Sequence, residues 1–229
     1  MDGVSGIRYI LMDVDNTLLD FDRCAESAMR RALDEAGLPW EARMFPVFTV
    51  RNNALWEQVE QGSITAETLY RIRWNLIFEE LGIPADGQAF EGRFHAFLAE
   101  SHETVPGAEA LVRYLSGRYA VYVASNASYA QQARRLELAG LREYIRELFV
   151  SQRVGFSKPD PRFFAHCLTA LNAAPEETVL IGDSLSADIR GGLDAGLHTC
   201  WYNPAGRVPD ETCRPEWTVR KLEEIRRIL

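Results

Sequence analysis

Two aspartates separated by one residue stand near the start of the chain. Asp13 and Asp15 belong to the stretch Asp-Val-Asp-Asn-Thr and follow the apolar residues 7–12, which predict a buried strand. Ligands of open parallel sheets bind outside the carboxyl ends of the strands. Two carboxylates this close repel each other unless a cation neutralises them or a proton is shared. The pair therefore predicts phosphoryl transfer at a Mg²⁺ site, since Mg²⁺ prefers oxygen ligands and a substrate phosphate supplies one. A plain turn rich in Asp and Asn is the alternative.

Further polar side chains follow two later apolar stretches. One stretch ends at Asp183, with Asp188 a helical turn beyond it, so a third and a fourth carboxylate become available. The other ends in Ser125 and Asn126, which offer a hydroxyl, an amide and backbone N–H groups at a strand-to-helix junction. Junctions of this kind bind phosphate.

Lysine is rare in this sequence. The chain carries 25 Lys plus Arg residues, and only Lys158 and Lys221 are lysines. If the side chain of Lys158 must fit between a phosphate and a carboxylate, its compact ammonium suits that space, whereas a planar guanidinium would not fit. A stray surface lysine ahead of a helix is the alternative.

These four groups of residues, in this order along the chain, resemble the motifs of the haloacid dehalogenase-like hydrolases. That family carries Asp-x-Asp-x-Thr, a Ser or Thr after the second core strand, a Lys, and a Gly-Asp followed by a further acid, and the chain has all four. The resemblance implies a Rossmann-like core and a role for each matching residue. The implied roles are nucleophile for Asp13, general acid/base for Asp15, phosphoryl binding for Ser125, Asn126 and Lys158, and Mg²⁺ coordination for Asp13, Asp15, Asp183 and Asp188.

The implied chemistry is a hydrolysis in two steps. Attack by Asp13 would form an aspartyl-phosphate, which divides one difficult hydrolysis into two easier reactions. Mg²⁺, Lys158, Ser125 and loop N–H groups would stabilise the charge on the transferring phosphoryl group. Asp15 would protonate the leaving alkoxide and later accept a proton from water. Dehalogenases of the family lack an acid at this position, so Asp15 argues for phosphate chemistry.

The composition is that of an ordinary globular enzyme. With 229 residues, 47% of them hydrophobic, the chain can form one large domain or a medium domain with an insertion. A net charge of −8 and a pI near 5.1 argue against a nucleic-acid partner. Scattered cysteines, no evident secretory leader and no apolar run near the roughly 18 residues of a membrane span predict a cytoplasmic protein without a membrane partner.

The periodicity of the apolar residues predicts an α/β fold with an inserted cap. Residues 1–18 and 104–229 are expected to form a Rossmann-like, doubly wound parallel sheet, because short strands alternate there with helices. Residues 19–103 show only helical periodicity and predict an all-helical cap domain. Expected cap helices are 22–36, 46–61, 65–81 and 87–101, with Gly37, Gly62 and Gly82 at helix ends and Thr65 or Ser63 as a cap. Expected later strands are 119–124, 146–150, 178–182, 197–202 and 217–219, before a helix from Arg220.

Within the family, the chain resembles bacterial pyrimidine 5′-nucleotidases. The likeness covers the cap as well as the core, whereas membership of the wider family needs only the core. It implies a small phosphorylated partner, a pyrimidine nucleoside monophosphate, for a monomer or homodimer. The residues that carry it are Phe21-Asp22, Asn52-x-x-Leu55-Trp56, Gly62-x-Ile64-Thr65, Arg73, the stretches 191–197 and 199–203, and Pro215-x-Trp217-Thr218-Val219.

Three cap residues are candidates for contact with a nucleoside. Asn52 can pair with a pyrimidine edge, Trp56 offers a stacking face, and Arg73 can donate several hydrogen bonds. The alternatives are a helix cap for Asn52, helix packing for Trp56 and a solvated helix face for Arg73.

Other functions share the same motifs. The ester could be phosphoglycolate or a sugar phosphate, and a phosphosugar mutase would return the phosphoryl group to a sugar. A binding protein with a disabled phosphatase fold is the non-enzymatic alternative, and four intact charges in one crevice argue against it, because burying them is costly.

Overall fold

The computed structural model describes residues 6–209 and 211–229, which form two compact units. One unit contains the residues up to Asp20 and those from Glu103 onward, and the other is Phe21–His102. The inserted unit thus begins two residues later and ends one residue earlier than the expected range 19–103.

The larger unit is built on a six-stranded parallel sheet with the order β3-β2-β1-β4-β5-β6. Its strands are β1 (Tyr9–Met12), β2 (Ala120–Ser125), β3 (Leu148–Val150), β4 (Thr178–Gly182), β5 (His198–Tyr202) and β6 (Trp217–Val219). Leu11 of the central strand β1 pairs with Tyr122 on one side and Leu180 on the other. The winding reverses at β1, and such a switch point is where doubly wound sheets bind ligands. The predicted α/β fold class is confirmed.

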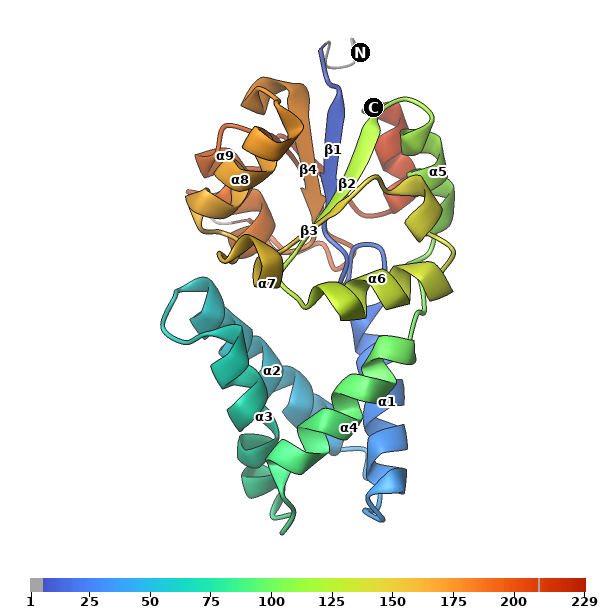
Figure 1. Cartoon of the computed structure of the whole chain (residues 1–229), viewed down its shortest axis with the longest axis vertical. Helices are drawn as coiled ribbons and strands as arrows, with labels where there is room; N and C mark the ends of the chain where they lie inside the picture. The colour runs from blue at the N-terminus through green and yellow to red at the C-terminus, as the bar shows by residue number, and fades with distance from the viewer. Residues whose placement is uncertain (1–5, 210) are drawn as a thin grey trace. The chain divides into compact units, whose positions relative to one another are not determined.

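Helices cover both faces of this sheet (Figure 1). They are α5 (Ala108–Ser116), α6 (Tyr129–Leu138), α7 (Ser151–Val154), α8 (Pro161–Leu171) and α9 (Gly191–Asp194). Short 3₁₀ segments are η1 (Arg142–Tyr144), η2 (Pro175–Glu177) and η4 (Leu222–Arg227), and η3 (Leu185–Arg190) is a π-helical turn. The last segment, expected as a helix from Arg220, is therefore the 3₁₀ helix η4.

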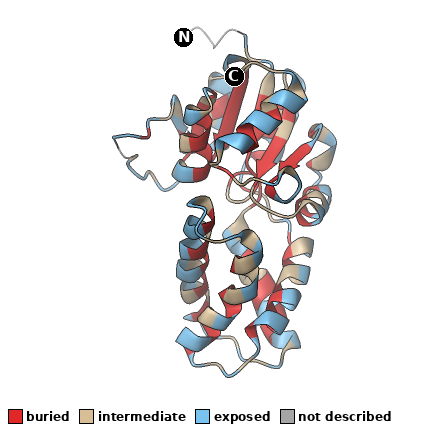
Figure 2. Cartoon of the chain, turned by 60° about the vertical axis from the view of Figure 1, so that its left-hand side comes forward, coloured by how far each residue is buried: buried red, intermediate tan, exposed pale blue. Residues whose placement is uncertain are grey.

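Alternate residues of the strands fill two separate apolar layers. Ile10 and Met12 lie in one buried cluster with Leu111 of α5, whereas Leu11 lies in another with Phe163 of α8. Successive side chains of a strand point to opposite faces, so a strand covered on both faces must be apolar throughout. Figure 2 shows the result as strands that are almost entirely buried between half-exposed helices.

The smaller unit consists of four helices. They are α1 (Phe21–Glu35), α2 (Met44–Glu60), α3 (Ala66–Leu81) and α4 (Gly87–Glu100). Thr65 is the N-cap of α3 and accepts a hydrogen bond from the Thr68 N–H at 3.2 Å. Helix α2 begins two residues before the expected start at Pro46. Proline is tolerated at this position because the N–H groups of the first turn of a helix have no helical partner.

The core of this unit is aromatic. The Trp74 ring lies 4.5 Å from Phe90, 5.1 Å from Phe94 and 5.4 Å from Phe48, centroid to centroid. These rings come from α2, α3 and α4 and bury large apolar areas with favourable ring geometry. The cap therefore has a hydrophobic core of its own. Among the described residues of the whole chain, no helix is long and apolar enough to cross a membrane.

Candidate active site

Lys158 lies at the centre of the expected catalytic residues. Its side chain is 2% exposed, and its ammonium donates to Asp13 Oδ1 at 2.8 Å, Asp188 Oδ1 at 2.6 Å and the Ala124 carbonyl at 2.6 Å. An ammonium has three protons, so each proton has an acceptor. The structure thus brings Asp13, which follows β1, and Asp188, which lies in η3, to one cation.

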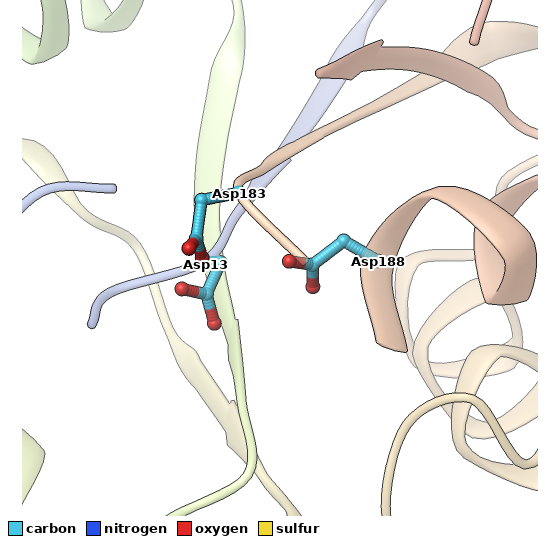
Figure 3. Close-up of side chains that lie close together, drawn as sticks. All are labelled: Asp13, Asp183 and Asp188. Carbon is cyan, nitrogen blue, oxygen red and sulfur yellow. The ribbon is translucent and has the colours of Figure 1, made fainter. Parts of the chain in front are cut away.

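Three aspartates converge on this point. Among the described residues, Asp13, Asp183 and Asp188 have carboxylate oxygens within 4.8 Å of one another, and Figure 3 shows the three carboxylates turned toward a common space. Asp13 extends β1, since its N–H donates to the Ile181 carbonyl at 2.9 Å. Asp183 directly follows β4.

Asp188 reaches the other two acids because of a π-helical turn and a glycine. The N–H groups of Asp188 and Ile189 both donate to the Ser184 carbonyl at 3.1 Å, and the Ser184 N–H donates to Asp188 Oδ2 at 3.1 Å. A Cβ on Gly182 would lie 2.2 Å from Asp188 Oδ2. Only glycine therefore leaves room for this carboxylate above the end of β4.

The charges in this space are unbalanced. Burial raises the pKa of Asp13 to about 7, although Lys158 lowers it. Burial and the charges of Asp13 and Asp188 raise the pKa of Asp183 well above its usual range. For Lys158, burial favours the neutral amine, but Asp13 and Asp188 outweigh it and raise the pKa of the ammonium. Three carboxylates around one ammonium fit a hard divalent cation, because oxygen donors are the ligands that Mg²⁺ prefers. Asp13, Asp183 and Asp188 are the side chains that could hold it.

This imbalance predicts a pH-dependent stabilisation by Mg²⁺. Because the pKa of Asp13 rises from 3.8 to about 7, the native protein keeps a proton that the unfolded chain loses. Without metal, this group lowers the free energy of unfolding as the pH rises through that interval. If Mg²⁺ binds there, it would remove this loss by neutralising the carboxylate. Thermal unfolding with Mg²⁺ or EDTA should give a larger Mg²⁺ effect at about pH 8 than at about pH 5.5. An equal stabilisation by Mg²⁺ at both pH values would contradict a metal site that includes Asp13.

Two side chains hold the backbone of Asp183. The Trp201 indole N–H and Arg207 Nη2 donate to the Asp183 carbonyl at 2.9 Å and 3.0 Å. Asn203 clamps the loop that carries Arg207: its amide accepts from the Arg207 N–H at 2.9 Å and donates to the Arg207 carbonyl at 2.8 Å. These contacts fix the loop after β4 against the loop after β5.

Asp15 does not join the three converging carboxylates. Its Oδ2 accepts from Gln132 Nε2 at 2.7 Å, and its Oδ1 accepts from Arg135 Nη1 at 2.5 Å. Both oxygens of Asp15 thus face α6, and Asp15 as a metal ligand stays a prediction. Sequence reasoning missed Gln132 and Arg135. Their signal is a pair of polar residues on the face of α6 that also carries the buried Leu136, where an apolar stripe is expected.

Ser125 and Asn126 lie at the end of β2 as predicted, but their side chains differ in use. Ser125 Oγ accepts from Gln132 Nε2 at 3.0 Å. The Asn126 amide donates to the Lys158 carbonyl and accepts from the Lys158 N–H, both at 2.8 Å. Asn126 thus holds the backbone of Lys158, which the prediction of a phosphoryl-binding residue did not include.

In the cap, two of the three nucleoside candidates bind each other. Arg73 is 2% exposed and donates to Asn52 Oδ1 at 2.7 Å and to both Glu91 oxygens, at 2.6 Å and 3.2 Å. Asn52 lies inside α2, so it is no helix cap, and Arg73 is no solvated residue. Glu91, whose pKa is raised by burial against the effect of Arg73, was not foreseen. Trp56 is partly buried, with its ring edge-on to Tyr70 at 6.2 Å.

Fold and site together define a hydrolase with a Rossmann-like core and an aspartate at the switch point of its sheet. The chain belongs to the haloacid dehalogenase-like hydrolases, whose family model matches residues 7–196. It is an enzyme of the phosphatase type in that family.

Relatives match both units. The pyrimidine 5′-nucleotidase PynA of Streptococcus pneumoniae is 33% identical over 95% of this chain and 93% of its own. The pyrimidine 5′-nucleotidase YjjG of Escherichia coli is 32% identical over 96% of this chain and 97% of its own. The crystal structure of the HAD-hydrolase YfnB of Bacillus subtilis superposes with a TM-score of 0.92 at 34% identity, covering 97% of this chain and 98% of that one.

Proposed function

We propose that this enzyme is a Mg²⁺-dependent phosphatase that hydrolyses nucleoside 5′-monophosphates, with pyrimidines preferred, in the cytoplasm. The observation that carries the proposal is the position of Asp13, which lies at the switch point of the sheet between Lys158 and two further acids. The choice of pyrimidine nucleotides rests on two relatives described as pyrimidine 5′-nucleotidases that match cap and core alike.

In the proposed first step, a carboxylate oxygen of Asp13 attacks phosphorus and the bond from phosphorus to the ester oxygen breaks. Asp15 gives a proton to that oxygen, so the nucleoside leaves as a neutral alcohol. In the second step, water attacks the aspartyl-phosphate and gives a proton to Asp15, and inorganic phosphate leaves Asp13. Lys158 stabilises the added negative charge throughout, because it is fixed beside the nucleophile.

Magnesium is part of the proposal. The related YfnB structure is described as bound to magnesium, and the three converging carboxylates here offer oxygen donors of the required kind. When bound, Mg²⁺ would shield the charge of the phosphate and of Asp13. The chain's own part is to hold Asp13 and Asp188 together against their mutual repulsion. The Lys158 ammonium donates to both, and the Ser184 N–H donates to Asp188.

Substrate choice is tested by phosphate release with a panel of esters. UMP, dUMP, dTMP and CMP should give higher kcat/KM than AMP, GMP, phosphoglycolate and sugar phosphates, and EDTA should abolish every activity. A phosphatase that prefers phosphoglycolate or a sugar phosphate would keep the core chemistry and overturn the pyrimidine assignment. An isomerised sugar phosphate with little free phosphate would indicate a mutase instead.

The second part of the proposal concerns recognition of the base by the cap. Trp56 remains the candidate for stacking on a base, whereas Asn52, Arg73 and Glu91 form a buried cluster. Substitution Trp56→Leu should therefore raise KM for UMP while the activity toward p-nitrophenyl phosphate stays unchanged. Equal losses with both esters would mean that Trp56 serves only helix packing.

A further inference from the structure

The side chain of Asp15, the proposed acid/base, is 32% exposed. It is nevertheless held by two side chains that are themselves buried, Gln132 with no exposure and Arg135 with 1%. Burying a guanidinium on a helix face is costly unless it is paired. The structure therefore places two costly polar groups beneath one carboxylate.

The contacts form a closed arrangement. Gln132 Nε2 lies 2.7 Å from Asp15 Oδ2 and 3.0 Å from Ser125 Oγ, so one amide group joins the proposed acid/base to the proposed phosphate-binding hydroxyl. Arg135 Nη1 lies 2.5 Å from Asp15 Oδ1 and 3.2 Å from Gln132 Oε1. Each polar end of Gln132 is thus fixed, and both oxygens of Asp15 are fixed with it.

The loop that carries Asp15 does not depend on these contacts. Its backbone is closed by bonds from the N–H groups of Leu18 and Leu19 to the Val14 carbonyl, both at 2.8 Å, and from the Asn16 N–H to the Leu19 carbonyl at 2.7 Å. What Gln132 and Arg135 add is the direction of the Asp15 side chain. A carboxylate that is partly in solvent would otherwise lose that direction to its rotamer freedom.

We propose that Arg135 and Gln132 are positioning residues for the proton transfers of Asp15, holding its carboxylate beside the Ser125 hydroxyl. The proposal rests on the proposed phosphatase function. The two transfers it concerns are the proton given to the leaving ester oxygen and the proton taken from the attacking water. Positioned acid–base groups contribute about 10²- to 10⁴-fold in rate, and a 1 Å misplacement can cost about 10²-fold.

The leaving group distinguishes this role from a purely structural one. An alkoxide such as the 5′-oxygen of a nucleoside needs a proton to leave, whereas p-nitrophenolate leaves without one. If Arg135 positions Asp15, the substitution Arg135→Met should slow nucleoside release from UMP in a single turnover by about 10²-fold. The burst of p-nitrophenol from p-nitrophenyl phosphate should change little, while the steady state that follows it slows because water must still lose its proton.

Two further variants and a control complete the test. Gln132→Met should show the same leaving-group dependence without removing a buried charge, and Arg135→Lys should restore part of the rate. Arg134→Met, on the exposed side of the same helix, should behave as wild type. Thermal unfolding of each variant reports on folding. Equal losses in the UMP turnover and the p-nitrophenol burst, or no loss in either, would overturn the proposal.

Failure of the proposed function gives a different result. A wild-type enzyme that ignores UMP and hydrolyses another alkyl phosphate overturns only the substrate assignment, and the comparison with p-nitrophenyl phosphate is then made with that ester. A wild-type enzyme that hydrolyses neither kind of ester overturns the phosphatase assignment and the positioning role together.

Discussion

Substitution Asp13→Asn should leave a folded enzyme that releases no measurable phosphate. Loss of the catalytic nucleophile of a serine protease lowers kcat by about 10⁶-fold, and a neutral amide cannot form the aspartyl-phosphate. Folding should survive because burial already disfavours the charge of Asp13, whose pKa is raised to about 7. The amide oxygen can still accept a hydrogen bond from Lys158. Phosphate release and thermal unfolding measure the two effects.

Two further measurements on Asp13→Asn should show that it removes the nucleophile without unfolding the protein. In the presence of EDTA at about pH 8, Asp13→Asn should unfold at a temperature equal to or above that of wild type, because one repelling charge is gone. Mass spectrometry of the acid-quenched wild type should detect the phosphorylated peptide around Asp13, and the variant should lack it. Asp34→Asn, which removes an exposed acid from α1, is the matched control. Turnover at the wild-type rate in Asp13→Asn would exclude Asp13 as the nucleophile.

Lys158→Met should cause the largest combined loss of activity and stability. The methionine keeps the apolar length of the side chain but leaves Asp13, Asp188 and the Ala124 carbonyl without their donor. Removing one partner of a buried ion pair costs about 3–5 kcal/mol. The transferring phosphoryl group also loses a preorganised cation, for which a reduction in kcat of about 10²- to 10³-fold is expected. Chemical denaturation in EDTA and phosphate release in Mg²⁺ measure the two losses separately.

The chain offers a matched control for this experiment, since its only other lysine is Lys221. The Lys221 side chain is 73% exposed and lies 4.0 Å from Glu223, so Lys221→Met should change stability by less than about 0.5 kcal/mol. Lys158→Arg keeps the charge but presents a planar fork in place of a point charge, and should lose most activity. If Lys158→Met were no less stable than Lys221→Met in EDTA, the ammonium would not hold the carboxylates together.

Much of the fold follows from local patterns. Strand β4 was expected at 178–182, where the structure has it, and β6 was expected at 217–219. Left-handed backbone at Gly37, Gly62 and Gly82, with φ of +68°, +72° and +70°, confirms the predicted helix ends. These features depend on residue type and on spacing within a few positions. Element ends differed by a few residues, as in α2, which begins two residues before the expected Pro46.

The sequence did not predict the buried polar clusters of the two units. The sequence is compatible with Arg73 as a nucleoside contact or a solvated residue, and the structure pairs it with Glu91, 18 positions away. No local pattern pairs Gln132 and Arg135 with Asp15, because Asp15 lies 117 and 120 positions earlier. Polar residues on an amphipathic helix give no local indication of whether a distant charge will meet them.

The sequence by itself determined which residue types the candidate site contains: an aspartate pair after the first strand, a serine after a later one, a rare lysine and a Gly-Asp with a further acid. These residue types follow strand ends, and parallel strands must present those ends at one edge, so their assembly could be inferred. Only the tertiary structure decided which side chain each of them contacts. It assigned Asp15 to α6 instead of the converging carboxylates, Asn126 to Lys158, and Arg73 to the interior of the cap. Such pairings depend on distances between elements far apart in the chain, which no local pattern of residues contains.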